Sequence, residues 1–247
     1  MVNPAGREAY LRRYQEFFAG NSLRGLRLVV YQHSAVGRDL LVELLQSLGA
    51  EVIPAGRSET FVPIDTEAID ADALEHIRTL AGEATATRGR VDAVVSIDGD
   101  SDRPLLVGID RDAGGRCVAK FFGGDLVGMV VAEFLGADAV VVPISCNDAI
   151  DRGTLKSLLE PKPRIGSPFV IAGMEAARAK GTQRVCGWEA NGGFLTGSDI
   201  VRKGCMLTAL PTRDAFLPLL CVLFSMVESG QGMSEVFGTL PRRFSRA

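Results

Sequence analysis

Three aspartates at alternating positions are the clearest chemical feature of the chain, in the segment Asp98-Gly99-Asp100-Ser101-Asp102-Arg103. Carboxylates this close repel one another, and without a cation between them their pKa values would rise. A divalent ion removes that conflict, and an all-oxygen ligand set suits a hard cation such as Mg²⁺. The residues therefore predict a Mg²⁺ site with Asp98, Asp100 and Asp102 as ligands, in a turn that Gly99 allows.

Other acidic loops fit these residues less well. An EF-hand loop needs Gly at its sixth position and Glu at its twelfth, where this chain has Arg103 and Ile109. A phosphatase of the haloacid-dehalogenase type also places an Asp-x-Asp pair after an apolar strand, but its fifth position is usually Thr, and here it is Asp102. An Asp-nucleophile phosphatase and a solvated acidic turn capped by Arg103 stay as alternatives.

The elements before the loop follow a strand, helix, strand pattern. Residues 26–31 read as a buried strand, residues 40–48 as a helix that ends at Gly49, and residues 50–54 as a second strand. This order is typical of a right-handed crossover in a parallel sheet. A helix over 66–82 and a strand over 91–97 follow, and the strand delivers the aspartate loop to the carboxyl edge of the sheet, where α/β proteins bind ligands.

A hairpin and a second α/β pattern come after the loop. The hairpin strands are expected at 104–109 and 116–121. Helices are then expected from Gly123 to Leu135, near 169–180 and over 212–228, with strands at 139–143 and 184–186. The alternation predicts the α/β class, with two consecutive α/β/α layered domains and mixed, mostly parallel sheets. We expect a helical lead-in over 1–22 and domains over 23–122 and 123–247.

Composition narrows the class of partner. The chain has 247 residues, 47% of them hydrophobic, and a formal net charge of −3, which argues against a nucleic-acid or anionic-membrane surface. Its five cysteines form no CxxC pair, so a zinc site and a disulfide framework are not expected. The apolar run 215–227 is too short to span a bilayer. We expect a cytoplasmic protein with a small-molecule partner and neither nucleic acid nor membrane.

The aspartate loop closely resembles the DGDGDR or DGDADR loop of the alpha-D-phosphohexomutases. A second segment, Gly187-Trp188-Glu189-Ala190-Asn191-Gly192-Gly193, looks like the sugar-recognition loop of that family, usually written GEESGH. The resemblance implies that the three aspartates hold Mg²⁺ beside a phosphorylated serine and that Arg103 acts in catalysis, steadying the phosphoryl group or the loop. It also implies that Glu189 and Asn191 bind the hydroxyls of a mannose or glucose phosphate.

The resemblance also has departures. Gly193 stands where many members have His, and residues 31–37 replace a DPGNG-like turn. The segment 164–168 resembles a T-x-x-G segment that approaches the substrate, and Asp214 corresponds roughly to the acidic start of a helix. The likeness covers only the second and third of the family's four domains. The Ser-His-Asn-Pro loop with the phosphoserine and the Arg-Pro-Ser-Gly-Thr phosphate loop of the terminal domain have no counterpart here.

The implied activity is the Mg²⁺-dependent interconversion of hexose 1-phosphate and 6-phosphate through a bisphosphate intermediate. Two alternatives follow from the partial coverage: an enzyme whose other domains are supplied by a full-length gene product, or a noncatalytic fragment that binds metal and sugar phosphate. We expect no appreciable mutase activity from these residues alone. His33 with Ser34 predicts no hydrolase, because no acid partner is evident. Trp188 is expected either to stack on a sugar or to pack in a wall.

Overall fold

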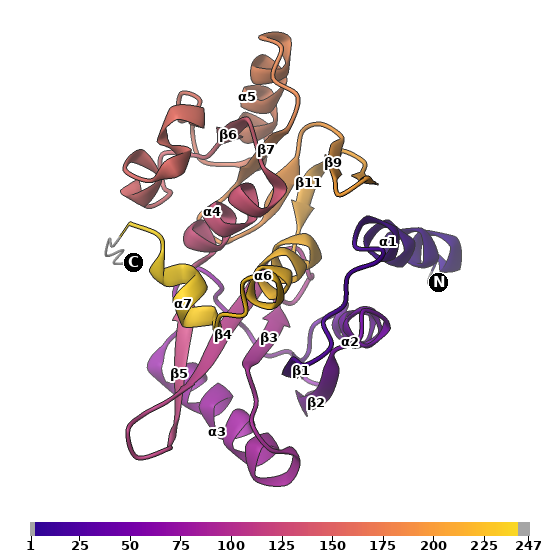
Figure 1. Cartoon of the computed structure of the whole chain (residues 1–247), viewed down its shortest axis with the longest axis vertical. Coiled ribbons are helices and arrows are strands. Elements are labelled where there is room, and N and C mark those ends of the chain that lie inside the picture. The colour runs from indigo at the N-terminus through magenta and orange to yellow at the C-terminus, as the bar shows by residue number, and fades with distance from the viewer. Residues whose placement is uncertain (1–2, 242–247) are drawn as a thin grey trace.

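The computed structural model describes residues 3–241 and contains two main β-sheets with helices on their faces (Figure 1). The first sheet has the strand order β2-β1-β3-β4-β5. Its strands are β1 (Arg27–His33), β2 (Glu51–Arg57), β3 (Ala93–Ile97), β4 (Pro104–Arg111) and β5 (Cys117–Phe122). Strand β1 runs parallel to β2 and β3, whereas β3, β4 and β5 pair antiparallel.

The second sheet has the order β11-β8-β7-β6. Its strands are β6 (Ala139–Val141), β7 (Val185–Trp188), β8 (Phe194–Thr196) and β11 (Leu210–Asp214), and a separate two-stranded ribbon consists of β9 (Ile200–Arg202) and β10 (Cys205–Leu207). Only β6 and β7 pair in parallel in this sheet. The expected mixed α/β layering is confirmed, but the detail that the sheets are mostly parallel is wrong, because both sheets continue into antiparallel strands.

Seven α-helices cover the sheets in the described residues. They are α1 (Pro4–Phe17), α2 (Arg38–Ser47), α3 (Ala71–Arg88), α4 (Gly124–Leu135), α5 (Ser167–Ala179), α6 (Phe216–Ser229) and α7 (Met233–Gly238), with 3-10 turns at Asp148–Asp151 and Thr154–Leu158. Helix α3 packs on the outer face of the first sheet and α5 on the outer face of the second. Between the two sheets lies a shared layer to which α4, α6 and α7 belong (Figure 1).

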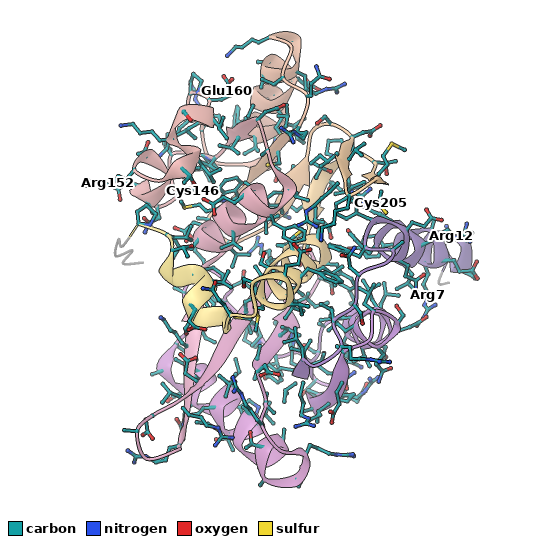
Figure 2. All side chains as sticks on the ribbon, in the orientation of Figure 1. Arg7, Arg12, Cys146, Arg152, Glu160 and Cys205 are labelled. Carbon is teal, nitrogen blue, oxygen red and sulfur yellow. The ribbon has the colours of Figure 1, made fainter. Side chains whose placement is uncertain are left out.

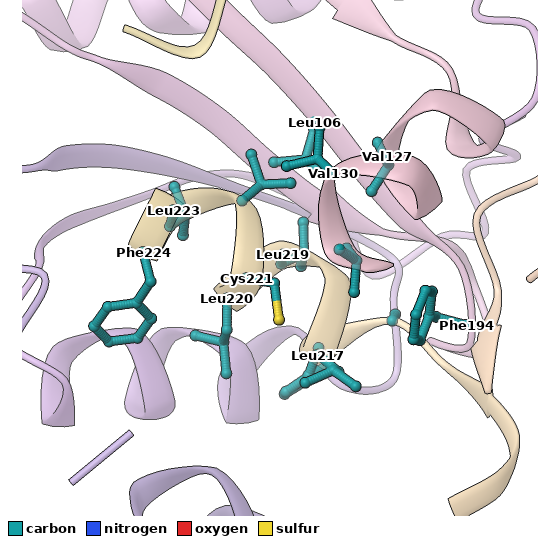
Figure 3. Close-up of a cluster of buried hydrophobic side chains, with 14 of the residues drawn as sticks. Leu106, Val127, Val130, Phe194, Leu217, Leu219, Leu220, Cys221, Leu223 and Phe224 are labelled. Atoms are coloured by element: carbon teal, nitrogen blue, oxygen red, sulfur yellow. The ribbon is translucent and has the colours of Figure 1, made fainter. Parts of the chain in front are cut away.

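Helix α6 occupies the centre of that layer because its residues from Phe216 to Phe224 are all apolar and buried. Its side chains meet Leu106 of β4, Val127 and Val130 of α4, and Phe194 of β8 (Figure 3). A helix that is hydrophobic all round must be buried all round. The largest core of the protein therefore joins residues from both expected domains. The boundary at 122–123 stays a prediction, and residues 1–2 and 242–247 of the expected ranges lie outside the described part.

Helices α3 and α6 differ most from the expected ranges, and α3 also ends at Arg88 instead of residue 82. Helix α3 begins at Ala71 instead of residue 66, because the Asp70 side chain accepts a hydrogen bond from the backbone N–H of Ala73 and caps the helix there. Helix α6 begins at Phe216 instead of residue 212, because residues 210–214 pair with β8 as strand β11. Pairing across the sheet decided the second case, and sequence periodicity does not report it.

Several charged side chains extend from the surface of the molecule. Arg7 and Arg12 extend from α1, and Arg152 extends from a 3-10 turn (Figure 2). Within residues 3–241, no helix combines the length and the apolar character that a membrane crossing requires.

Candidate active site

The aspartate loop joins β3 to β4. The backbone N–H of Asp98 donates to the carbonyl of Arg103 at 3.0 Å, which closes the loop. One carboxylate oxygen of Asp98, Oδ1, accepts from the backbone N–H groups of Asp102 and Arg103, each at 3.0 Å. Ser101 carries the left-handed backbone conformation, with φ of 69°. Gly99 lies in the turn, as expected, but its φ is not positive. Its lack of a side chain also leaves room for Phe61, since a Cβ at 99 would lie 3.2 Å from the Phe61 ring.

The three predicted metal ligands do converge. One carboxylate oxygen from each of Asp98, Asp100 and Asp102 lies within 4.8 Å of the others. Burial raises the pKa of Asp98 to about 6, and the neighbouring carboxylates add to that rise. Burial also raises the pKa of Asp102. Asp102 Oδ1 is buried without a hydrogen-bond partner. An all-oxygen set with an orphaned carboxylate oxygen fits a hard divalent cation.

Arg103 lies beside these carboxylates. Its Nε is 3.7 Å from Asp98 Oδ2 and 3.6 Å from Asp102 Oδ1, and its side chain is 39% exposed. Nε itself is buried without a hydrogen-bond partner. The guanidinium therefore offsets part of the negative charge of the loop and keeps an edge open to solvent.

The turn after β1 holds the aspartate loop through hydrogen bonds. The backbone N–H of Gly37 donates to Ser101 Oγ at 2.9 Å, and that of Val36 donates to the carbonyl of Gly99 at 3.1 Å. Fully buried His33 donates from Nε2 to the carbonyl of Ile97 at 2.7 Å, since a carbonyl can only accept. Burial lowers the pKa of His33. This turn, which departs from the family pattern, has a structural role, and His33 has no access to a substrate.

The recognition loop follows β7. Glu189 is 6% exposed, and its Oε2 accepts a hydrogen bond from Ser167 Oγ at 3.0 Å. Ser167 begins α5 and lies in the segment expected to approach the substrate. Asn191 Oδ1 accepts from the backbone N–H of Gly193 at 3.0 Å, while the Asn191 carbonyl accepts from Thr66 Oγ1 at 3.0 Å. Thr66 therefore connects the recognition loop to the segment before α3.

Trp188 packs in a wall and does not face the site. It is 1% exposed, and its Nε1 donates to the carbonyl of Asp125 at 3.1 Å. Its ring stacks on Phe194, with centroids 5.8 Å apart and an interplanar angle of 8°. Of the two expectations for Trp188, wall packing is the correct one.

One charged side chain at the candidate site was not expected from the sequence. Arg213 of β11 places Nη2 2.6 Å from Asp102 Oδ2 and Nη1 3.6 Å from Glu189 Oε2. It therefore joins the aspartate loop to the recognition loop, which are far apart in the sequence. No motif marks this arginine, because its position depends on the pairing of β11 with β8.

Known proteins match both halves of the chain in sequence. Sequence profiles of the phosphoglucomutase/phosphomannomutase family match residues 8–111 as alpha/beta/alpha domain II and residues 123–244 as alpha/beta/alpha domain III. A phosphomannomutase of Sinorhizobium fredii (strain NBRC 101917 / NGR234) is 41% identical over 227 residues, covering 92% of this chain and 45% of that protein. One from Salmonella muenchen is 40% identical over 236 residues, covering 96% and 46%.

Solved structures show the same fold. A phosphoglucomutase/phosphomannomutase family protein from Burkholderia thailandensis superposes with a TM-score of 0.68 at 19% identity, over 98% of this chain and 48% of that one. The Aspergillus fumigatus N-acetylphosphoglucosamine mutase, determined in complex with GlcNAc-6P and magnesium, gives 0.58 at 18% identity, over 96% and 53%. The chain spans about half the length of the curated relatives it matches. With both of its α/β/α units matched, the chain belongs to the phosphoglucomutase/phosphomannomutase family, as domains II and III.

Proposed function

We propose that this chain carries the metal-binding and sugar-recognition parts of a phosphohexomutase that interconverts hexose 1-phosphate and 6-phosphate. The observation that carries the proposal is the Asp102–Arg213–Glu189 bridge, which holds the predicted metal loop against the predicted sugar loop. Mannose phosphates are the first substrates to test, because the two relatives at 40–41% identity are phosphomannomutases.

The proposed metal ligands are Asp98, Asp100 and Asp102, and the proposed ion is Mg²⁺. The convergent oxygen ligands support this, as does the magnesium in the Aspergillus relative's structure. A bound Mg²⁺ would offset the negative charge that a transferring phosphoryl group spreads over its oxygens. Arg103, with its solvent-open edge, adds a second positive charge from the protein itself.

The sugar is proposed to meet Glu189 and Asn191. A buried carboxylate accepts hydrogen bonds from hydroxyl groups, and the Ser167 contact holds Glu189 in one orientation for that task. Asn191 uses its Oδ1 within the loop, so its side-chain NH₂ is the group available to a ligand. The phosphoryl donor, implied by the resemblance to be a phosphoserine, would come from the family's first domain.

A titration of Mg²⁺ by isothermal calorimetry tests the metal site. Asp100 is exposed, so Asp100→Asn removes the negative charge of one proposed ligand with little effect on folding. We expect at least about a tenfold loss of Mg²⁺ affinity, because losing one carboxylate from a three-carboxylate site costs more than about 1.4 kcal/mol. Glu83→Gln, an exposed residue on α3, is the matched control for the loss of one negative charge. Equal Mg²⁺ binding by both variants would refute the metal assignment.

Binding of mannose 1-phosphate and 6-phosphate in the presence of Mg²⁺ tests the sugar site. Glu189→Gln keeps the size of the side chain and removes its charge, and we expect weaker binding of both phosphates. Unchanged affinity in this variant would exclude Glu189 as a sugar ligand. Turnover is best measured with the other family domains added, because the expected phosphoryl donor belongs to them.

The phosphatase alternative makes Asp98 the nucleophile. That role is disfavoured by the position of Asp98, which is 7% exposed and already accepts two backbone hydrogen bonds. Incubation with an aryl phosphate followed by trapping of an aspartyl phosphate at Asp98 would establish the phosphatase in its place.

A further inference from the structure

Strand β11 bulges where it passes the recognition loop. Leu210 pairs with Thr196 and Asp214 pairs with Phe194, so β11 uses two more residues than β8 between these pairs. A bulge re-aims the side chains of the strand that contains it. Arg213 lies inside this bulge, immediately before the residue at which pairing resumes.

The far end of the bulge is anchored by buried hydrogen bonds. Asp214 is 4% exposed, and its Oδ1 accepts from the Tyr10 hydroxyl at 2.6 Å and from the backbone N–H of Phe216 at 3.0 Å. Its Oδ2 accepts from the hydroxyl of fully buried Tyr14. Helix α1 and the start of α6 therefore fix the backbone from which Arg213 extends.

Gly193 makes the room that the Arg213 side chain occupies. A Cβ on Gly193 would lie 2.7 Å from Arg213 Cδ and 2.9 Å from Cγ, closer than non-bonded carbons can approach. Gly193 is not among the glycines with positive φ, so a lack of side chain, and not a special backbone conformation, is what this position requires. A side chain at 193 and the observed Arg213 conformation therefore exclude each other.

The Arg213 guanidinium has N–H donors to spare. It lies between two carboxylates, Asp102 at 2.6 Å and Glu189 at 3.6 Å, and its side chain remains 28% exposed. A guanidinium has five N–H donors in a fork that matches phosphate oxygens. Two acidic partners hold its position, and its open edge can donate to an anion.

We infer that the lack of a side chain at Gly193 makes room for Arg213, and that Arg213 binds the phosphoryl group of the hexose phosphate. We call Gly193 and Arg213 an exchange pair, because a side chain at 193 would exclude the observed arginine conformation. This inference rests on the proposed function and deepens it, because it names the group that recognises the ligand's charge. Arg213 contacts the ligand directly and keeps Asp102 and Glu189 at a set separation.

Ligand affinity tests the phosphoryl contact. Calorimetry with mannose 6-phosphate, and with mannose as the uncharged comparison, is carried out on the whole chain and on Arg213→Met, Arg213→Lys and Arg178→Met. Arg178 is an exposed arginine in the last turn of α5 and serves as the matched control. We expect Arg213→Met to bind mannose 6-phosphate at least about tenfold more weakly, as for a lost charged hydrogen bond. Arg213→Lys should be intermediate, because it keeps the charge without the fork.

A double-mutant cycle tests the exchange pair without any ligand. Gly193→Ala should lower the midpoint of urea unfolding when Arg213 is present, and by less than half as much in an Arg213→Ala background. If the effect of Gly193→Ala is the same in both backgrounds, the two residues do not compete for space and the exchange pair is wrong.

The outcomes separate the inference from the proposed function. If the unmodified chain binds mannose 6-phosphate and Arg213→Met binds it equally well, the inference fails and the proposed function stands. If the unmodified chain binds neither mannose 6-phosphate nor its 1-phosphate, the proposed function fails, and the phosphoryl role of Arg213 with it.

Discussion

Gly128 lies where α4 crosses the indole of Trp188, the residue before Glu189. A Cβ at Gly128 would be 2.3 Å from the Cδ1 and Nε1 atoms of the indole, more than 1 Å inside an ordinary contact distance of about 3.4 Å. The indole cannot move freely, because it is stacked on Phe194 and its Nε1 donates to Asp125. Gly128→Ala must therefore displace Trp188 or α4.

The net change in the free energy of unfolding follows from two destabilising effects and one stabilising effect. Overpacking in a well-packed core costs about 1–3 kcal/mol. A strained or broken indole hydrogen bond adds about 1 kcal/mol, and the better helix propensity of alanine returns about 1 kcal/mol. We expect Gly128→Ala to lower the free energy of unfolding by about 2 kcal/mol, which corresponds to a fall in Tm of about 4–8 °C in a chain of this size.

Gly82 supplies the matched control. It also lies within a helix, α3, but a Cβ there would meet nothing within 4 Å. Gly82→Ala should therefore raise the free energy of unfolding by up to about 1 kcal/mol. Urea unfolding gives both values, and the emission of Trp188, the only tryptophan, reports displacement of the indole in folded Gly128→Ala. A Gly128→Ala variant as stable as Gly82→Ala, with unchanged emission, would refute the reasoning.

Three further predictions concern two buried tyrosines, the cysteines and Ser101. Burial, reinforced by the Asp214 carboxylate, raises the pKa values of Tyr10 and Tyr14. Their contribution to stability is therefore complete below about pH 10 and is lost as pH rises further, by about 1.4 kcal/mol per pH unit for each tyrosine. Urea midpoints at increasing pH should fall more steeply for the unmodified chain than for the variant with both tyrosines changed to Phe, and equal slopes would contradict this. A thiol reagent should modify only Cys117 and Cys205 in the folded chain. The other three cysteines should react only after unfolding, because burial raises the pKa of each of their thiols; they are Cys146, Cys186 and Cys221. Rapid modification of more than two cysteines would argue against the packing. Ser101→Ala should lower the free energy of unfolding by about 1 kcal/mol, because the N–H of Gly37 loses its acceptor. Ser101→Gly should lower it by less, because glycine relieves the left-handed backbone at 101. Thermal unfolding of both variants gives the comparison, and the opposite order would be inconsistent with the loop geometry.

The sequence was sufficient for the features that depend on neighbouring residues. Alternating aspartates after an apolar strand predicted the loop at Asp98–Asp102, and the carboxylates converge as expected. The hairpin of β4 and β5 and the buried helix α6 were also predicted, since turn residues and hydrophobic runs are local signals. The resemblance to the phosphohexomutases rested on two such local motifs, and it is confirmed.

Tertiary structure decided what depends on distant pairing. The start of α3 is a different case, because it depends on a local cap, Asp70, that the sequence already contained. The assignment of residues 212–214 to a helix was wrong because these residues belong to β11, which pairs with β8. The sequence pattern around residues 212–214 does not report that pairing. The same pairing and its bulge bring Arg213 between Asp102 and Glu189, over the space left by Gly193. A contact between an arginine and two loops depends on strand register and side-chain direction, which only the folded chain determines.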